Sequence, residues 1–265
     1  MSRIEDLPVL IYTMGRVSSG STSIALMKAG FDNRFHVHTM NEDWREWTNS
    51  PNPQRGMTKQ QEERYHFDRK VRADIIDTGK EALIISLVRE PLTRNMSAFF
   101  MNQVDKKKVT DTDPDDLVRK FKKRYAHYVP LQWYQREFNT VLDVDVFANP
   151  FDKKLGYQLL ERGPYKILLL RTELTNEAKG EALSEFLGRP IEMEVARKKS
   201  QYELSDEALD TYREFKKHAK VRPEFLDWIY SSKYARHFMS KREMREMRER
   251  WESPNAPDQP WRTQP

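Results

Sequence analysis

The most constraining feature of this sequence is Val9–Gly30, VLIYTMGRVSSGSTSIALMKAG, which passes from an apolar run through a Gly/Ser/Thr loop into an amphipathic segment. Val9–Tyr12 contains β-forming residues and is followed by Gly15, so we predict a buried strand. Hydroxyl residues crowd the start of the next segment and Gly30 stands at its end, which predicts a capped helix. A strand, a Gly-containing loop and a helix N-terminus in succession are typical of an anion-binding loop.

The loop resembles a nucleoside-triphosphate loop but lacks its lysine. Gly15, Gly20 and Thr22 nearly fit the pattern GxxxxGK[ST], whereas Ser21 stands at the lysine position. A loop without this lysine is a poor ATP site. Arg16 offers a planar cation that suits sulfate or a 5′-phosphate. The pattern alone equally allows a plain structural turn between a strand and a helix.

The charge balance and the absence of cysteine narrow the function classes. The formal net charge is +5, because 46 basic residues face 41 acidic ones, which suits an anionic small molecule and does not demand nucleic acid. Without cysteine there are no disulfides, no thiolate catalysis and no Cys-ligated metal. The N-terminal residues lack an apolar signal core and no window is apolar enough for a membrane span, so we expect a cytoplasmic protein.

Apolar runs alternate with amphipathic segments along the first 203 residues. This alternation predicts an α/β fold with a parallel sheet and helices on both faces. Residues 204–252 show only helical patterns and are expected to form a C-terminal helical extension, and 253–265 a flexible Pro-rich tail. Further strands are expected at Arg34–Thr39, Ala82–Val88, Val141–Phe147 (short or at an edge) and Lys166–Leu170.

Helices are expected between and after these strands. The expected helices comprise 58–78, segments that begin near Pro91, Pro114 and Pro130, and a segment that ends at Gly188. Ligands of parallel α/β sheets bind beyond the C-terminal ends of the strands. Residues at these ends include Gly15–Thr22, His38, Arg89 and Arg171.

A second segment, SLVREPLTRNMSAFF, places Arg89 at a strand end and Ser97 eight residues later on the next helix. This arrangement resembles the 3′-phosphate-binding element of sulfotransferases that use 3′-phosphoadenosine 5′-phosphosulfate. Val9–Gly30 resembles the 5′-phosphosulfate loop of the same superfamily. The resemblance covers most of the chain and implies a P-loop-like parallel sheet flanked by helices, the sulfotransferase fold.

Within that superfamily the chain is most similar to bacterial proteins of capsular polysaccharide synthesis. The similarity rests on Arg89–Phe100, an aromatic segment near Trp133, Asp145 with Phe151 and Asp152, and the block Ser231–Phe238. It implies transfer of a sulfuryl group from the nucleotide donor to a hydroxyl, with 3′,5′-bisphosphoadenosine as product. The expected acceptor is a carbohydrate or a related metabolite.

The resemblance also implies a set of donor-binding residues. The family usually has a lysine in the first loop; Arg16 takes its place here, with Ser18 as an alternative alignment. In-line sulfuryl transfer depends on positioning and charge stabilisation, so Arg16 is a catalytic candidate and no metal is required. The implied donor contacts are Gly15, Arg16, Val17, Ser18, Ser19, Gly20, Ser21, Thr22, Arg89, Arg94 and Ser97.

The acceptor hydroxyl must lose a proton, so a general base is expected near the donor sulfate. Histidine has a suitable unperturbed pKa, and His38 is the first candidate because it is the last histidine before the end of the second expected strand. His36, Glu42 and Asp43 are the competing candidates.

Two other function classes stay open at this point. One is a nucleotide kinase or NTPase of the P-loop type, and the other is a catalytically inactive member that keeps the fold as a binding module. The basic runs Lys106–Lys108 and Arg242–Arg250 are typical of solvated helix faces, with attraction of an acidic glycan as the alternative. The expected partners are the nucleotide donor and a glycan acceptor, without nucleic acid; the sequence does not specify an oligomeric state.

Overall fold

The computed structural model describes residues 4–43, 59–104, 113–194 and 205–256. The chain divides into two compact units. The first, called the α/β unit here, comprises Met1–Arg89 and Trp133–Ser200; the second, the helical unit, comprises Glu90–Gln132 and Gln201–Pro265. Lys106–Lys108 and most of the expected tail lie outside the described residues.

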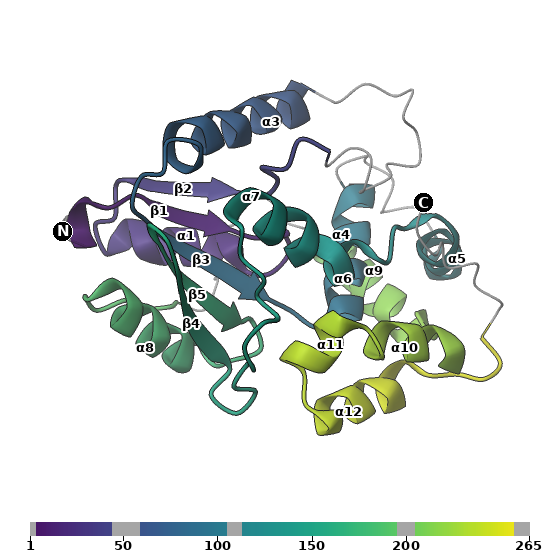
Figure 1. Cartoon of the computed structure of the whole chain (residues 1–265). Coiled ribbons are helices and arrows are strands. Elements are labelled where there is room, and N and C mark those ends of the chain that lie inside the picture. Colours follow the sequence, from purple (N-terminus) through teal and green to yellow (C-terminus); the bar gives the residue numbers. More distant parts are fainter. Residues whose placement is uncertain (1–3, 44–58, 105–112, 195–204, 257–265) are drawn as a thin grey trace. The chain divides into compact units, whose positions relative to one another are not determined.

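The α/β unit contains a five-stranded sheet with the order β2-β1-β3-β5-β4 (Figure 1). Strands β2, β1, β3 and β5 are parallel, and β4 joins the edge antiparallel to β5. The predicted α/β fold with flanking helices is therefore confirmed, and the sheet is parallel as predicted except for β4. The strands are β1 Val9–Tyr12, β2 Arg34–Val37, β3 Ala82–Val88, β4 Tyr157–Arg162 and β5 Tyr165–Arg171.

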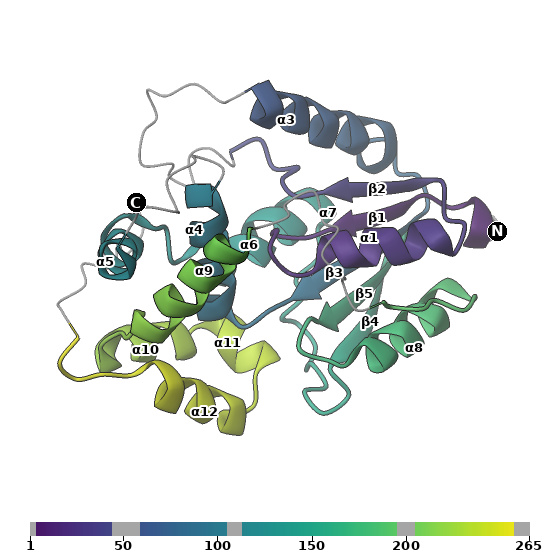
Figure 2. The same ribbon diagram turned by 180° about the vertical axis from the view of Figure 1, so that it is seen from behind.

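Helices α1 (Ser19–Lys28) and α8 (Asn176–Leu187) cover one face of the sheet (Figure 2). Gly30, at φ +80°, ends α1 as predicted, because its N–H and that of Phe31 bond to the carbonyls of Met27 and Leu26. Gly188 ends α8 in the same left-handed conformation. Every residue of β1 and β3 is buried, as expected for parallel strands whose sheet is covered by helices.

An aromatic segment covers β1 on the other face. It comprises α6 (Val129–Tyr134), the π-helical turn η3 (Gln135–Asn139) and α7 (Thr140–Leu142). The Tyr12 ring stacks on Phe138 with ring centroids 5.1 Å apart. Beside β2 lie α3 (Lys59–Val71) and the π-helical turn η2 (Arg72–Ile76), within the predicted helix 58–78.

Three strand predictions need correction. The strand expected at Val141–Phe147 is wrong, because Asp143 at φ +54° ends α7 and the Asp145 side chain accepts the Phe147 N–H at 2.9 Å to form a turn. Strand β4 was not predicted; its residues are half-buried or exposed and give no apolar run. Strand β2 ends at Val37 instead of Thr39, since the Asp68 carboxylate accepts the N–H groups of His38 and Thr39.

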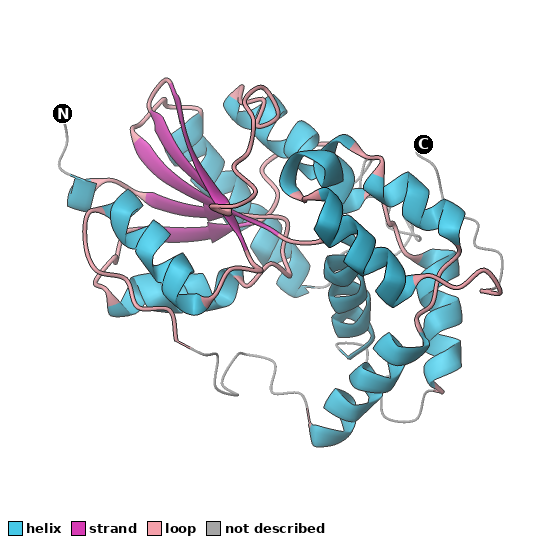
Figure 3. Cartoon of the chain, turned by 90° about the horizontal axis from the view of Figure 1, so that it is seen from below, coloured by secondary structure: helices cyan, strands magenta, loops and turns pink. Residues whose placement is uncertain are grey.

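The helical unit packs helices from two separate stretches of sequence around one core. Figure 3 distinguishes the helices, in cyan, from the strands of the sheet, in magenta. The expected apolar residues Leu92, Met96, Phe99 and Phe100 lie in this core together with Phe215. Serine caps begin three of the helices and Pro223 occupies the first turn of another, as the sequence rules favour. The helices are α4 (Pro91–Val104), α5 (Pro114–Arg124), α9 (Asp206–His218), α10 (Pro223–Tyr230), α11 (Lys233–Phe238) and α12 (Lys241–Trp251).

Across the described residues, none of the helices combines the length and the apolar character needed to cross a membrane.

Candidate functional site

The loop between β1 and α1 lies at the topological switch point of the sheet. β1 stands between β2 and β3, so the chain leaves β1 toward one side and returns for β3 on the other. Ligands of open parallel sheets bind at the strand C-termini where the order reverses in this way. This loop, Thr13–Ser18, is called the β1–α1 loop below.

Left-handed backbone conformations concentrate in the β1–α1 loop. Gly15, Arg16 and Ser18 have φ angles of +72°, +62° and +65°. For a residue with a side chain this conformation costs about 1–2 kcal/mol, and such strain clusters at functional sites. Two non-glycine residues, Arg16 and Ser18, have this left-handed conformation within three positions. This strain indicates that the loop has a functional role in addition to reversing the chain direction.

The N-terminus of α1 leaves backbone donors available to an anion. Ser18 occupies the N-cap position without a side-chain cap, and Thr22 is the first residue whose N–H bonds back, to the Ser18 carbonyl at 3.2 Å. Within the described chain, the N–H groups of Ser19, Gly20 and Ser21 have no hydrogen-bond partner. Three such groups at the positive end of a helix suit a phosphate or sulfate group.

Side chains that directly follow β3 and β5 tether the β1–α1 loop. Arg89 Nη1 donates to the Arg16 carbonyl at 2.7 Å, and Thr172 Oγ1 donates to the Val17 carbonyl at 3.1 Å. The Thr172 N–H bonds the Val88 carbonyl at 2.8 Å, so the ends of three neighbouring strands are joined. The loop conformation is therefore fixed from both sides of the switch point.

A buried lysine that the sequence patterns did not single out joins this group. Lys179 of α8 is 7% exposed and its Nζ donates to the Thr172 carbonyl at 3.2 Å. Burial lowers the pKa of Lys179. Lys179 thus brings a second side-chain cation, besides Arg89, to the residues that hold the loop.

His38 lies against the first half of the β1–α1 loop. Its Nδ1 is 2.8 Å from the Thr13 carbonyl oxygen, and a Cβ placed on Gly15 would lie 3.7 Å from His38 Cε1. Because a carbonyl oxygen only accepts, Nδ1 carries the hydrogen and the lone pair of the neutral ring is on Nε2. This tautomer is the one that a general base acting through Nε2 requires.

The competing base candidates are placed differently. The His36 ring lies edge-on to that of His38, with centroids 4.7 Å apart, and burial lowers the pKa of His36 to about 4. Glu42 is 75% exposed and pairs with Arg69 and Arg72. In the described part of the chain neither Glu42 nor Asp43 forms a hydrogen bond or ion pair with the β1–α1 loop. His38 is therefore the candidate that bonds to this loop.

Two buried carboxylates hold the segment that follows β2. Asp68 Oδ2 accepts the N–H groups of His38 and Thr39 at 3.0 and 3.1 Å. Glu137 Oε2 accepts those of Met40 and Asn41 at 2.8 and 3.0 Å. Each carboxylate therefore satisfies two adjacent backbone donors, and together they fix the backbone from His38 onward.

Glu137 also reaches back to β1. Tyr12 Oη donates to Glu137 Oε2 at 2.5 Å, while the other carboxylate oxygen, Oε1, is buried without a hydrogen-bond partner. Burial raises the pKa of Glu137 to about 7, and burial also raises the pKa of Asp68. Burial, with the neighbouring Glu137 carboxylate as a second cause, holds the pKa of Tyr12 well above its usual value.

The helical unit carries the remaining predicted donor residues. Arg94 is buried and its Nη1 donates to Asn95 Oδ1 at 3.1 Å and to Tyr125 Oη at 3.2 Å; Ser97 is half-buried on α4. Glu90, between the predicted Arg89 and Pro91, accepts the N–H groups of Leu92 and Thr93 at the start of α4. The pairing of Arg89 with Ser97 stays a prediction, because these residues belong to different compact units.

Comparison with known proteins gives one match. Residues 115–240 match the family model NKWYS, described as "Putative capsular polysaccharide synthesis protein". This stretch contains Glu137, Thr172 and Lys179 but neither the β1–α1 loop nor Arg89. Searches of curated proteins and of solved structures gave no match. The chain is thus similar to a family of polysaccharide synthesis proteins over slightly less than half of its length.

Proposed function

We propose that this protein is a sulfotransferase that moves a sulfuryl group from 3′-phosphoadenosine 5′-phosphosulfate to a hydroxyl of a saccharide. The observation that carries the proposal is the contact of His38 with the β1–α1 loop at the switch point. A proton acceptor there adjoins the uncapped N-terminus of α1, where an anion is stabilised. Acceptor activation and donor binding then take place at one site.

The β1–α1 loop and α1 hold the 5′-phosphosulfate of the donor in this proposal. The unpartnered N–H groups of Ser19, Gly20 and Ser21 donate to its oxygens, and Arg16 adds a cation. Thr22 Oγ1 lies 3.4 Å from the Ser18 carbonyl, so its hydroxyl also stabilises the first turn. For the 3′-phosphate we retain Arg89 and Ser97, the contacts that the resemblance implies, with Arg94 as an additional contact.

His38 serves as the general base. Its Nε2 takes the proton of the acceptor hydroxyl as the acceptor oxygen bonds to sulfur and the bond from sulfur to the 5′-phosphate oxygen breaks. The bond from Nδ1 to the Thr13 carbonyl orients the ring and stabilises the protonated form. The charge that develops on the leaving phosphate is stabilised by the helix N-terminus and Arg16.

A saccharide acceptor is favoured by the similarity to capsular polysaccharide synthesis proteins. Transfer of labelled sulfate from the donor to a panel of oligosaccharides tests the activity, and calorimetric titration with 3′,5′-bisphosphoadenosine tests the donor site. We expect micromolar or tighter binding of the bisphosphate and weaker binding of ATP. Absence of bisphosphate binding, or ATP turnover that requires Mg²⁺, would reject the proposal, the second result in favour of a P-loop NTPase.

Donor binding without transfer to any acceptor would instead indicate a catalytically inactive binding protein. Where transfer is observed, the variant His38→Asn tests the base, because it removes the proposed base while leaving the loop donors in place. Equal behaviour of this variant and the parent protein in a transfer assay would exclude His38 as the base.

A further inference from the structure

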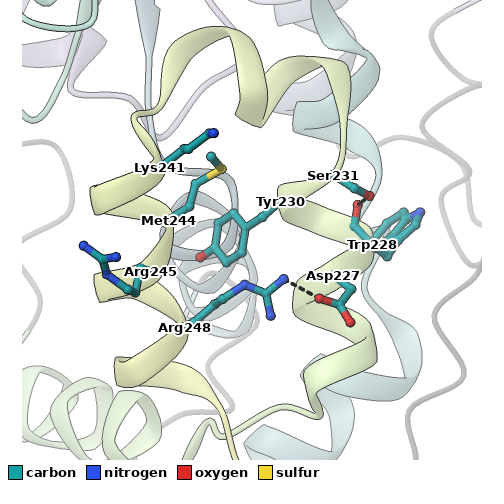
Figure 4. A pocket seen from close by; sticks show the side chains of 8 residues that line it. All are labelled: Asp227, Trp228, Tyr230, Ser231, Lys241, Met244, Arg245 and Arg248. Atoms are coloured by element: carbon teal, nitrogen blue, oxygen red, sulfur yellow. Dashed lines mark hydrogen bonds and ion pairs between the residues drawn. The ribbon is translucent and has the colours of Figure 1, made fainter.

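A pocket of about 480 Å³ opens between α10 and α12 of the helical unit (Figure 4). Lys241, Met244, Arg245 and Arg248 of α12 line one wall; their spacing places them on one face of that helix. From α10, Tyr230 points toward α12 and forms the opposite wall, whereas Trp228 stands at the far rim of the pocket. The volume lies in the range of small-molecule sites.

Both ends of the pocket wall are fixed. At the N-terminus of α12, Ser240 and Glu243 form a capping box in which each side chain bonds the other residue's backbone N–H. At its C-terminus, the Val221 N–H bonds the Trp251 carbonyl at 2.9 Å, and the Ser253 N–H bonds the Val221 carbonyl at 2.9 Å. The pocket is therefore preformed by backbone contacts and requires little rearrangement to accept a ligand.

The pocket carries an excess of positive charge. Arg248 forms ion pairs with Asp227 and Glu252, so its charge is balanced within the unit. Lys241 and Arg245 have neither an ion pair nor a side-chain hydrogen bond among the described residues. Elsewhere on α12, Arg242 is paired with Glu246 at 2.7 Å. Lys241 and Arg245, which extends outward at the rim (Figure 4), thus add two unbalanced positive charges to the pocket lining and favour an anionic ligand.

Apolar and aromatic side chains also line the pocket, Met244 on the same helix as the two cations and Trp228 at the opposite rim. Trp228 and Met244 are half-buried and pack against the core of the helical unit. Tyr230 is 4% exposed, and its hydroxyl donates to Glu90 Oε1 at 3.0 Å, so this hydroxyl is engaged away from a ligand. Flat apolar surface beside cations suits a ring that has an apolar face and an acidic substituent.

We infer that the pocket between α10 and α12 binds an acidic saccharide, with Lys241 and Arg245 on its carboxylate or sulfate groups and Trp228 against a sugar ring. The choice of a saccharide rests on the proposed function, whereas the preference for an anion rests on the charges of the pocket alone. The family match extends over α10 and ends at Ser240, directly before α12. The pocket gives the helical unit a role in holding the glycan.

Binding to the full-length protein, measured by calorimetry without the sulfate donor, tests the inference. The probe is a hyaluronan hexasaccharide, compared with the neutral chitin hexasaccharide and with hexaaspartate. The double variant Lys241→Gln/Arg245→Gln removes the two pocket cations. The double variant Arg242→Gln/Arg250→Gln removes the same charge from α12 outside the pocket lining, and thermal unfolding verifies that all variants are folded.

We expect the hyaluronan hexasaccharide to bind the parent protein and the pocket variant to lose about tenfold in affinity, because its hydrogen bonds to two charged groups are lost. The control variant should lose less than about threefold in affinity, because it changes only the long-range electrostatic attraction of the ligand. Trp228→Leu should weaken binding of the hexasaccharide but leave that of hexaaspartate unchanged.

Three results would overturn the inference. They are no binding of the acidic hexasaccharide, equal losses in the two charge variants, and binding of hexaaspartate as tight as that of the sugar. Because donor and catalysis play no part in this measurement, its failure leaves the proposed transfer reaction to its own test.

Discussion

Asp68 and Glu137 divide four consecutive backbone N–H groups between them: Asp68 accepts those of His38 and Thr39, and Glu137 those of Met40 and Asn41. Both side chains are fully buried. Burial of a carboxylate is costly, and the backbone N–H groups offset part of this cost by satisfying one oxygen of each side chain. This pairing fixes the residue that we propose as the base against the β1–α1 loop.

The elevated pKa of Glu137 makes stability depend on pH with a defined sign. In the folded protein Glu137 stays protonated up to about pH 7, whereas its unfolded pKa is 4.5. Between these values the folded state binds more protons, so stability falls as pH rises through this window. The neutral variant Glu137→Gln lacks this dependence.

We therefore expect the stability of the parent protein, relative to Glu137→Gln, to decrease by about 3 kcal/mol between pH 4.5 and pH 7.5. Urea unfolding of both proteins at these two pH values measures the change. His36, whose pKa is lowered to about 4, acts in the opposite sense, because acidification favours its unfolded form. A difference that stays constant with pH would show that folding does not change the pKa of Glu137.

Substitution of the two neighbouring histidines, His38 and His36, should distinguish the general base from a structural residue. His38→Asn should lower the rate of sulfate transfer by roughly 10²–10⁴-fold, the usual contribution of general base catalysis, with little change in bisphosphate affinity. His36→Asn should leave the rate within a few-fold, because His36 has a depressed pKa and a buried Nε2. Transfer rates under saturating donor compare the two, and a larger loss for His36→Asn would reverse the assignment.

Thr172, which directly follows β5, bonds the loop through its hydroxyl and the end of β3 through its backbone N–H. Thr172→Val removes the bond to the Val17 carbonyl and should cost about 1 kcal/mol of stability. Bisphosphate affinity should fall with it, because the loop is then free to leave its binding conformation. Thr172→Ser keeps the hydroxyl and should restore affinity; unfolding curves and calorimetry provide the readouts. Unchanged affinity in Thr172→Val would show that Arg89 alone holds the loop.

Local patterns allowed much of the α/β unit to be predicted. The burial of β1 and β3, the capped end of α1 and the start of α4 at Pro91 all follow from neighbouring residues. The false strand at Val141–Phe147 shows the limit, because alternating Val and Asp there form a turn through the Asp145 side chain.

The supporting residues of the site could not be predicted in this way. Glu137 bonds backbone groups 96 and 97 residues away in sequence, and Asp68 those 29 and 30 residues away. No periodicity marks such contacts, since each is a side chain meeting the backbone of a distant segment. The one available signal was charge in unexpected surroundings: Glu137 stands beside Phe138 in an aromatic stretch, and Asp68 beside Phe67.

Glycine substitutions at Arg16 and Ser18 should have similar effects on stability but different effects on donor affinity. Both have left-handed backbone, so Arg16→Gly and Ser18→Gly should each relieve about 1–2 kcal/mol of strain, partly offset by the greater entropy of an unfolded glycine. Both variants should therefore be as stable as the parent or slightly more so. Glycine is also acceptable at the N-cap position of Ser18.

Donor affinity should distinguish the two variants. Arg16→Gly removes the proposed loop cation and should weaken bisphosphate binding by about 10–100-fold, as expected for lost hydrogen bonds to a charged group. Ser18→Gly leaves the cation and the backbone donors of α1 in place and should bind nearly as well as the parent. The opposite order of affinities in calorimetry would favour the alignment in which Ser18 takes the position of the family lysine. Because neither substitution should destabilise the fold, a loss of binding reports directly on the loop.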